Sequence, residues 1–183
     1  MRGRRQGTLV NDITPRDHVL GPPDAPVTLL EYGDYQCPYC GAAHPIVKAL
    51  QRQLADSLRF AFRHFPLTTV HEYAEGAAEA AEAAGAQGKF WEMHDTLFEN
   101  QPALDFESLV GYAEELGLDV ERFATELENQ VYAARVKEDF ISGVRSGVNG
   151  TPTFFINGVR HEGSFDYETM LEAIQARMRG IAA

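Results

Sequence analysis

The chain has 183 residues, 44% of them hydrophobic, and a formal net charge of −11 at pH 7. This size and composition suit a single domain with a sizeable hydrophobic core. The negative charge argues against a nucleic-acid partner and against attachment to an anionic membrane surface. Residues 71–140 carry 17 Asp and Glu against 4 Lys and Arg, a surplus that is typical of solvated helical faces.

The N-terminal residues are basic, but they are not followed by the apolar run of seven or more residues that a complete secretory signal contains. No stretch approaches the roughly 18 apolar residues that span a bilayer. We therefore expect no membrane insertion, and a cytoplasmic location for the chain as written. Removal of an export signal would instead place the protein in the periplasm or elsewhere outside the cytoplasm.

The polar and basic residues 1–16 are expected to form a flexible N-terminal segment. After them, hydrophobic periodicity predicts a strand at 27–35, a helix at 38–55, a strand at 58–65, a helical block at about 70–146, strands at 153–156 and 159–161, and a helix at 166–179. Asn157 and Gly158 join the last two strands and are the strongest local signal for a hairpin. Inside the helical block, Asp105 and Asp119 are natural N-cap residues. This order predicts an α/β fold in which residues 17–183 form one domain.

The only two cysteines stand three positions apart, as Cys37-Pro38-Tyr39-Cys40, directly after the first long apolar strand. A helix that begins here places the first sulfur at its N-terminus, where unpaired N–H groups and the helix dipole favour a thiolate. Pro38 suits the first helical turn, because its missing N–H would have no partner within the helix. Since the thiolate is the form that attacks disulfides, the motif predicts a redox-active dithiol.

Other uses of the two cysteines are less favoured but stay open. A zinc site needs four ligands, and there is no second cysteine pair, although His44 lies one helical turn after Cys40. A purely structural disulfide across two residues closes too small a loop to stabilise much. The alternatives are therefore a protein that binds a metal or an iron–sulfur cluster, or one that senses redox state with the same pair.

Three stretches, residues 31–40, 90–95 and 150–158, resemble the DsbA-like thiol–disulfide oxidoreductases. The resemblance extends from about residue 17 to residue 179. It implies a thioredoxin-like fold, with a βαβ half, a ββα half and an all-helical insertion between them. It also implies an enzyme that exchanges disulfides with protein thiols.

The resemblance assigns chemical roles to three residues. Cys37 is expected to be the exposed nucleophile, and Cys40 the resolving thiol that attacks the mixed disulfide. Glu31, six residues before Cys37, matches the buried acid that accepts the proton of the resolving thiol. The alternative for Glu31 is a solvated side chain on a strand that frays.

The resemblance also assigns residues that shape the site. Pro152 matches the cis-proline that lies against the dithiol, and the backbone of Thr151 is expected to pair with the substrate peptide. Pro38 and Tyr39 lie between the cysteines and are expected to tune their reactivity. Strongly oxidising DsbA proteins carry Pro-His at this place, so Pro-Tyr predicts a less oxidising couple.

No cofactor and no bound metal are expected. The implied partners are proteins with cysteines or disulfides, and a recycling redox partner. A monomer is expected. His44 is interpreted as a surface residue, and His64 and His71 as ordinary histidines at a strand end and in a loop.

Overall fold

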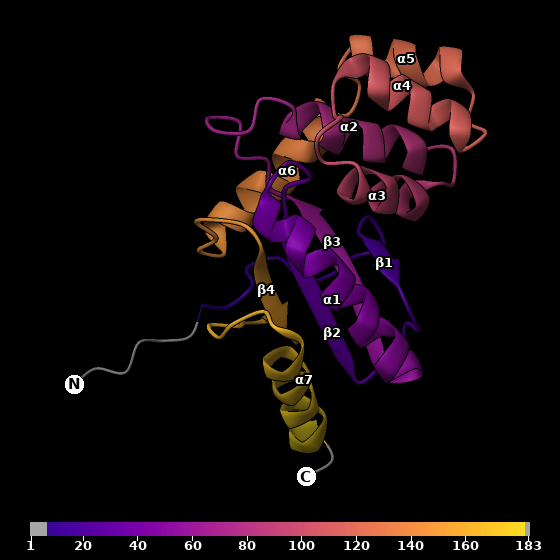
Figure 1. Cartoon of the computed structure of the whole chain (residues 1–183). Coiled ribbons are helices and arrows are strands. Elements are labelled where there is room, and N and C mark those ends of the chain that lie inside the picture. The colour runs from indigo at the N-terminus through magenta and orange to yellow at the C-terminus, as the bar shows by residue number, and fades with distance from the viewer. Residues whose placement is uncertain (1–6, 182–183) are drawn as a thin grey trace. The chain divides into compact units, whose positions relative to one another are not determined.

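The computed structural model describes residues 7–181, and within them five strands form one sheet in the order β1-β3-β2-β4-β5 (Figure 1). The strands are β1 (His18–Leu20), β2 (Val27–Gly33), β3 (Leu58–His64), β4 (Thr153–Ile156) and β5 (Val159–Arg160). The helices are α1 (Pro38–Leu54), α2 (Ala74–Gly85), α3 (Phe90–Glu99), α4 (Phe106–Glu115), α5 (Val120–Glu128), α6 (Ala133–Arg145) and α7 (Tyr167–Ile181), with a short 3-10 turn at Ala55–Ser57.

The described residues divide into two compact units. The first contains the chain up to Tyr32, then Ala42–Arg63, then the chain from Ile141 onward; the second contains Gly33–Gly41 and His64–Phe140. The second unit therefore holds most of the expected helical insertion together with the dithiol turn. The interpretation of residues 17–183 as a single domain stays a prediction.

The sheet belongs to the first unit and is paired antiparallel at three places. Val19 of β1 lies opposite Ala61 of β3, and Leu30 of β2 lies opposite Phe155 of β4. The hairpin predicted between β4 and β5 is confirmed, with Gly158 at φ +76°. Its preceding residue also has a positive φ, as a two-residue turn of this kind requires. Every residue of β2 except Thr28 is buried, which is typical of a strand covered on both faces.

The helices of the second unit pack around α2, which contacts α3, α4 and α5. The face of α2 at these contacts is made of small side chains, which allow close approach. The buried alanines of this helix are Ala74, Ala77, Ala78, Ala80, Ala81, Ala83 and Ala84. The two predicted N-caps are confirmed: Asp105 accepts from the N–H of Ser108 at 3.1 Å, and Asp119 from that of Arg122 at 3.0 Å.

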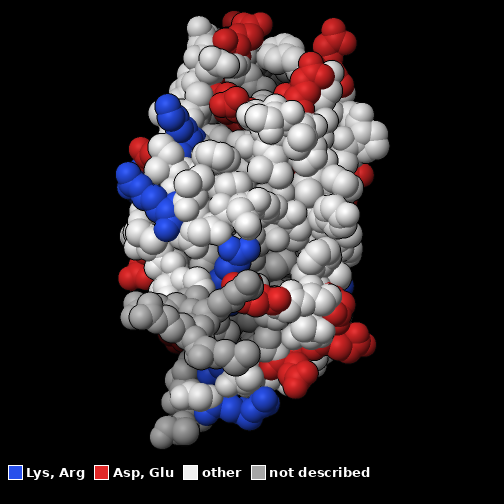
Figure 2. All heavy atoms as spheres, turned by 90° about the vertical axis from the view of Figure 1, so that its left-hand side faces the viewer, with Lys and Arg blue, Asp and Glu red and all other residues white. Residues whose placement is uncertain are grey.

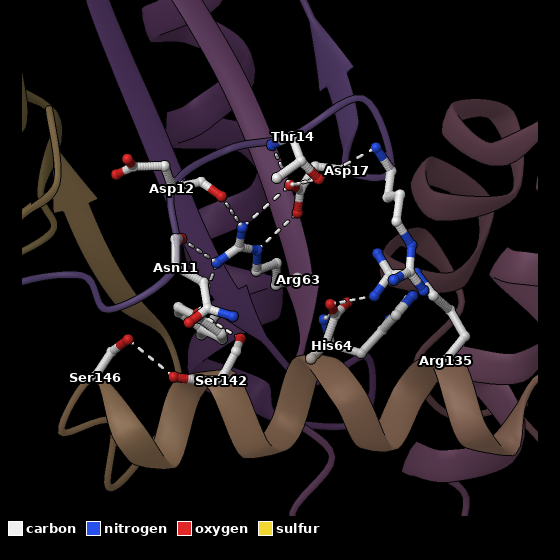
Figure 3. Close-up of polar contacts among 12 residues, drawn as sticks. Asn11, Asp12, Thr14, Asp17, Arg63, His64, Arg135, Ser142 and Ser146 are labelled. Atoms are coloured by element: carbon white, nitrogen blue, oxygen red, sulfur yellow. Dashed lines mark hydrogen bonds and ion pairs between the residues drawn. The ribbon is translucent and has the colours of Figure 1, made fainter.

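Residues 7–16 are held to the first unit by a buried arginine, Arg63, as Figure 3 shows. Its Nε and Nη2 donate to the two carboxylate oxygens of Asp17, at 2.7 and 3.0 Å. It also donates to the backbone carbonyls of Asn11 and Asp12, at 2.9 Å each. Five donors in a fixed plane suit such a set of acceptors. The flexible segment expected over residues 1–16 is thus wrong for its described part, and residues 1–6 lie outside the described residues.

Burial by itself would lower the pKa of Arg63, but the hydrogen bonds to Asp17 and Tyr32 outweigh it and raise the pKa above its usual value. The guanidinium group therefore stays charged. Its burial is tolerated in the folded protein because the carboxylate of Asp17 faces it. Both side chains of the pair are 4% exposed. Among residues 7–181, no helix combines the length and the apolar character needed to cross a membrane.

We expect Asp17→Asn to lower the free energy of unfolding by about 3–5 kcal/mol, because it leaves a buried guanidinium group without its counter-charge. Urea denaturation followed by circular dichroism measures this change. Asp24→Asn, at an exposed position of the same unit, is the matched control and should stay within about 0.5 kcal/mol of the wild type. Equal effects of the two substitutions would contradict the structural role of the ion pair.

Candidate active site

The dithiol lies at the start of α1, as predicted. Cys37 is the residue before the first helical residue, Pro38. Its carbonyl accepts the first helical hydrogen bond, from Gly41 N at 3.0 Å, and its N–H donates to the carbonyl of Asp34 at 3.1 Å. Cys37 is therefore the N-cap of α1, where the N–H groups of the first turn face its side chain. An anion at this position is stabilised by the helix dipole.

The two cysteines are not joined by a disulfide, and both are buried. Cys40 is 0% exposed, and its Sγ lies 3.5 Å from the donating N–H of Asp34. Cys37 is 3% exposed, so the expectation of an exposed nucleophile is wrong for this state of the protein. The segment after α3 contacts the backbone of this turn, which the sequence did not indicate.

The side chain that covers the turn is Gln101. Its Nε2 donates to the carbonyls of Tyr35 and Cys37, at 2.8 Å each. A Cβ at Gly41 would lie 2.2 Å from Oε1 of Gln101, so the glycine after the dithiol makes room for this contact. The glycine is visible in the sequence, but its partner is 60 positions away and carries no motif.

Asp34 fixes the other side of the turn. This carboxylate is 1% exposed. One oxygen accepts from the N–H of Gln36 at 2.8 Å; the other accepts from the N–H of Leu67 at 2.8 Å and lies 2.7 Å from Nδ1 of His71. The interpretation of His71 as an ordinary loop residue is therefore wrong, because it pairs with a buried acid three residues before Cys37.

An aromatic cluster holds the middle of the turn. The hydroxyl of Tyr35 lies 2.9 Å from Nδ1 of His94, and its ring centroid lies 4.8 Å from that of Phe98. Both partners belong to the apolar stripe of α3. The backbone of residues 34–37 is thus held by a carboxylate, an amide and an aromatic ring, all from the second unit.

A second buried cluster in this unit surrounds His64, which is 1% exposed. Its Nε2 lies 2.9 Å from Oε1 of Glu82, and its N–H donates to Asp139 at 3.1 Å. Arg135 pairs with both acids (Figure 3). Burial raises the pKa of Asp139, and the nearby His64 and Arg135 counter this effect. His64 is therefore part of an ion-pair network rather than an ordinary strand-end residue.

Three side chains of this network, from His64, Glu82 and Asp139, are close enough to share an ion. The guanidinium group of Arg135 already pairs with both carboxylates, so an ion-pair network explains the cluster better than a metal does. Among the described residues, neither cysteine belongs to a group of three or more such side chains.

The remaining predicted site residues divide between the units. Tyr39 stands in the dithiol turn and is 66% exposed. Glu31, in the first unit, is 2% exposed and lies opposite Phe154 in the sheet, so the alternative of a solvated side chain is wrong. The peptide bond between Thr151 and Pro152, also in the first unit, is cis.

His44 is a further correction. It is 7% exposed, whereas the sequence suggested a surface residue. Its place on α1, among the buried positions of an amphipathic helix, explains the difference.

We expect Gln101→Ala to lower the free energy of unfolding of the reduced protein by about 1–3 kcal/mol, because two carbonyls of the dithiol turn lose their donor. The alkylation of Cys37 by iodoacetamide should become faster, because the side chain that covers the turn is removed. Urea denaturation and timed mass spectrometry measure the two effects. Gln53→Ala, an exposed glutamine on α1, should change neither; an unchanged alkylation rate in Gln101→Ala would show that this side chain does not restrict access.

Comparisons with known proteins agree with this geometry. Residues 13–176 match the family model described as Thioredoxin. The oxidised form of BdbD from Bacillus subtilis is 26% identical, with a TM-score of 0.85 over 96% of this chain and 98% of that one. A thioredoxin-like oxidoreductase from Silicibacter pomeroyi DSS-3 is 29% identical, with a TM-score of 0.80 over 91% of this chain and 94% of that one.

The curated relatives of this chain are named as antiporters. The Na(+)/H(+) antiporter NhaA 1 of Salinispora arenicola is 52% identical over 165 residues, which are 90% of this chain and 25% of the antiporter. NhaA 3 of Salinispora tropica is 50% identical over 88% of this chain and 24% of its own length. The chain thus spans about a quarter of the length of the curated relatives it matches. The family match over most of the chain and the two similar solved structures show that the chain belongs to the thioredoxin family, in its DsbA-like form with a helical insertion.

Proposed function

We propose that this protein is a thiol–disulfide oxidoreductase that acts on protein thiols through Cys37 and Cys40. The observation that supports it most directly is the position of Cys37 as the N-cap of α1, with a second buried thiol in the same turn. A thiolate is stabilised at this place by the N–H groups and the dipole of the helix. The solved structures described above include proteins named as oxidoreductases.

The reaction proceeds in two exchanges. The Cys37 thiolate attacks one sulfur of a substrate disulfide, forms a mixed disulfide and releases the other substrate sulfur as a thiolate. Deprotonated Cys40 then attacks the sulfur of Cys37, which forms the Cys37–Cys40 disulfide and releases the second substrate thiolate. Two electrons pass to the substrate, and a recycling partner then supplies two electrons that reduce the Cys37–Cys40 disulfide to the dithiol again. The reverse sequence oxidises a substrate dithiol.

Three residues of the first unit have proposed roles in these steps. Glu31 accepts the proton of Cys40 before the second exchange; burial of an acid in a strand is costly unless the acid is used or paired. Thr151 presents its backbone to the substrate peptide as an added strand would, and the adjacent Pro152 shapes this binding surface.

The direction of the reaction depends on the compartment and the reduction potential. In a reducing cytoplasm the dithiol reduces or repairs its substrates, and in an oxidising compartment the disulfide form oxidises them. With Pro38 and Tyr39 between the cysteines, we propose a couple that is less oxidising than DsbA, whose potential is about −120 mV. We also propose that the protein acts as a monomer.

The second candidate function is redox sensing. It is favoured by the curated relatives, which are named as antiporters and are about four times as long as the matching segment. In such an arrangement the dithiol would switch the state of an associated protein instead of turning over substrates. Metal or iron–sulfur binding by the same cysteines has less support.

We expect Cys37→Ala to abolish disulfide exchange, because the attacking sulfur is lost. Cys40→Ala should instead accumulate a covalent adduct with a disulfide-containing protein, because the resolving thiol is lost. Insulin reduction measures the first effect, and non-reducing mass spectrometry the second. Retained exchange in Cys37→Ala would refute the mechanism. A wild-type protein whose dithiol oxidises reversibly but never turns over would favour the sensing function.

We expect Glu31→Gln to slow the resolution of the mixed disulfide at pH 7 by at least about tenfold, because Cys40 loses its proton acceptor. The defect should shrink as the pH approaches about 8.5, where an ordinary thiol ionises without help. Stopped-flow measurement of thiol release across this pH range tests both statements. Glu168→Gln, an exposed glutamate on α7, is the control, and a defect in Glu31→Gln that is independent of pH would argue for a structural role only.

A further inference from the structure

A pocket of about 360 Å³ lies in the second unit, between the start of α2, the start of α4 and the end of α5. Its rim is aromatic and exposed: Tyr73 is 42% exposed and Phe106 is 43% exposed. Its floor is buried, since Leu104 and Leu109 are each 2% exposed. The pocket therefore has an exposed aromatic rim and buried leucine side chains beneath it.

A carboxylate completes the floor. Glu79 lines the pocket, is 4% exposed, and its Oε2 has no hydrogen-bond partner among the described residues. Burial raises the pKa of this carboxyl, as does the charge of Glu75, while the backbone N–H groups of Tyr132 and Ala133 lower it in part. A buried acid with an unsatisfied oxygen is costly, and a cation placed at that oxygen would relieve the cost.

The shape and chemistry of the pocket select one class of cation. Metal ions such as Ca²⁺ need six or more oxygen ligands, whereas leucine side chains and aromatic rings make up half of the lining here, and among the described residues its glutamates do not form a group close enough to share an ion. A lysine or arginine side chain has an apolar stem and a charged end, so it can fill the pocket and reach its floor. The exposed aromatic rings at the mouth add an attraction for a cation.

The charge around the pocket also favours a cationic ligand. Glu72 and Glu75 also line it. Glu75 and Glu79, four positions apart, lie on one face of α2. On the face drawn in Figure 2, acidic side chains gather at the top of the view, the height at which Figure 1 draws α4 and α5, and a second group lies at the lower right. A negative field of this kind raises the local concentration of basic ligands.

The pocket is also connected to the dithiol turn. The N–H of Tyr73 donates to Oε1 of Gln36 at 2.7 Å, and Gln36 directly precedes Cys37. The rim of the pocket is therefore one side chain away from the backbone of the reactive turn.

We propose that this pocket binds a lysine or arginine side chain of the polypeptide substrate, with its cationic group at Glu79 and its stem against the apolar walls. This inference rests on the proposed oxidoreductase function. It identifies the class of substrate as proteins with a basic residue near the reactive cysteine.

The binding step is tested apart from redox chemistry in the full chain with Cys37→Ser and Cys40→Ser. Nα-acetyl-lysine amide and Nα-acetyl-arginine amide are titrated, and the amide shifts of Tyr73 and Phe106 are followed by NMR. Saturable shifts are expected with both, and binding at least tenfold weaker with the neutral Nα-acetyl-norleucine amide. Glu79→Gln should weaken binding of the lysine compound at least tenfold.

The matched control is Glu121→Gln, which makes the same charge change at an exposed position of α5 and should leave affinity within twofold. Phe106→Ser removes an exposed wall of the pocket and should weaken binding at least threefold, which keeps the test decisive if Glu79→Gln does not fold. Equal binding of the lysine and norleucine compounds overturns the proposal. So does a Glu79→Gln protein that is less stable but binds as well as the parent, because Glu79 would then only support the start of α6.

The substrate role is tested in the wild-type protein with two disulfide-linked peptides that differ only in lysine against norleucine next to the cysteine. The lysine peptide should be reduced with a kcat/KM at least fivefold higher, and Glu79→Gln should remove this difference without slowing the norleucine peptide. Equal turnover of the two peptides overturns the substrate role and leaves the oxidoreductase function intact. Turnover of neither peptide refutes the oxidoreductase function, and with it the substrate role, whatever the amide probes show.

Discussion

The conformation of residues 34–37 is the constraint on which the site depends. A cysteine gains a stabilised thiolate at a helix N-terminus only if its backbone takes the N-cap conformation and its side chain faces the N–H groups of the first turn. Here Asp34 holds the turn from one side through three donors, and Gln101 holds it from the other through two carbonyls. The backbone of the turn is therefore already in its reactive conformation before any substrate binds. Little conformational entropy has to be lost in this turn when the reaction takes place.

A buried arginine and a half-buried one show how the same chain holds carboxylates in its interior. Arg63 in the first unit and Arg135 in the second each face carboxylates that are themselves almost fully buried. Compared with apolar residues of the same size, such ion pairs add little to the free energy of unfolding. Removing only one partner, however, destabilises the folded protein strongly, because a buried charge is left unpaired. Their consequence is positional: Arg63 ties the described N-terminal segment to the sheet, and Arg135 joins α6 to α2 and the end of β3 through one network.

The sequence predicted what local patterns determine. The dithiol at the start of α1, the caps at Asp105 and Asp119 and the hairpin at Gly158 each depend on a few consecutive residues, and all three are confirmed. The sequence did not predict the hydrogen bonds from Gln101 to the carbonyls of Tyr35 and Cys37, nor the pairing of His71 with Asp34. Those contacts join residues far apart in the chain, and no periodicity marks the partner of a single glutamine or histidine. The same reason explains the error at the N-terminal segment, since its anchor, Arg63, looks like an ordinary polar residue of an alternating strand.

The acidic second unit must be reconciled with a site that stabilises an anion. A surplus of negative charge opposes the ionisation of a thiol, but salt screens charges beyond about 8 Å at physiological ionic strength. Only nearby carboxylates therefore matter to Cys37, and that of Asp34 is occupied by donors on both of its oxygens. The helix N–H groups can then dominate locally. The distant acids act instead on the molecules that approach, and they favour basic polypeptides over acidic ones before any covalent step begins.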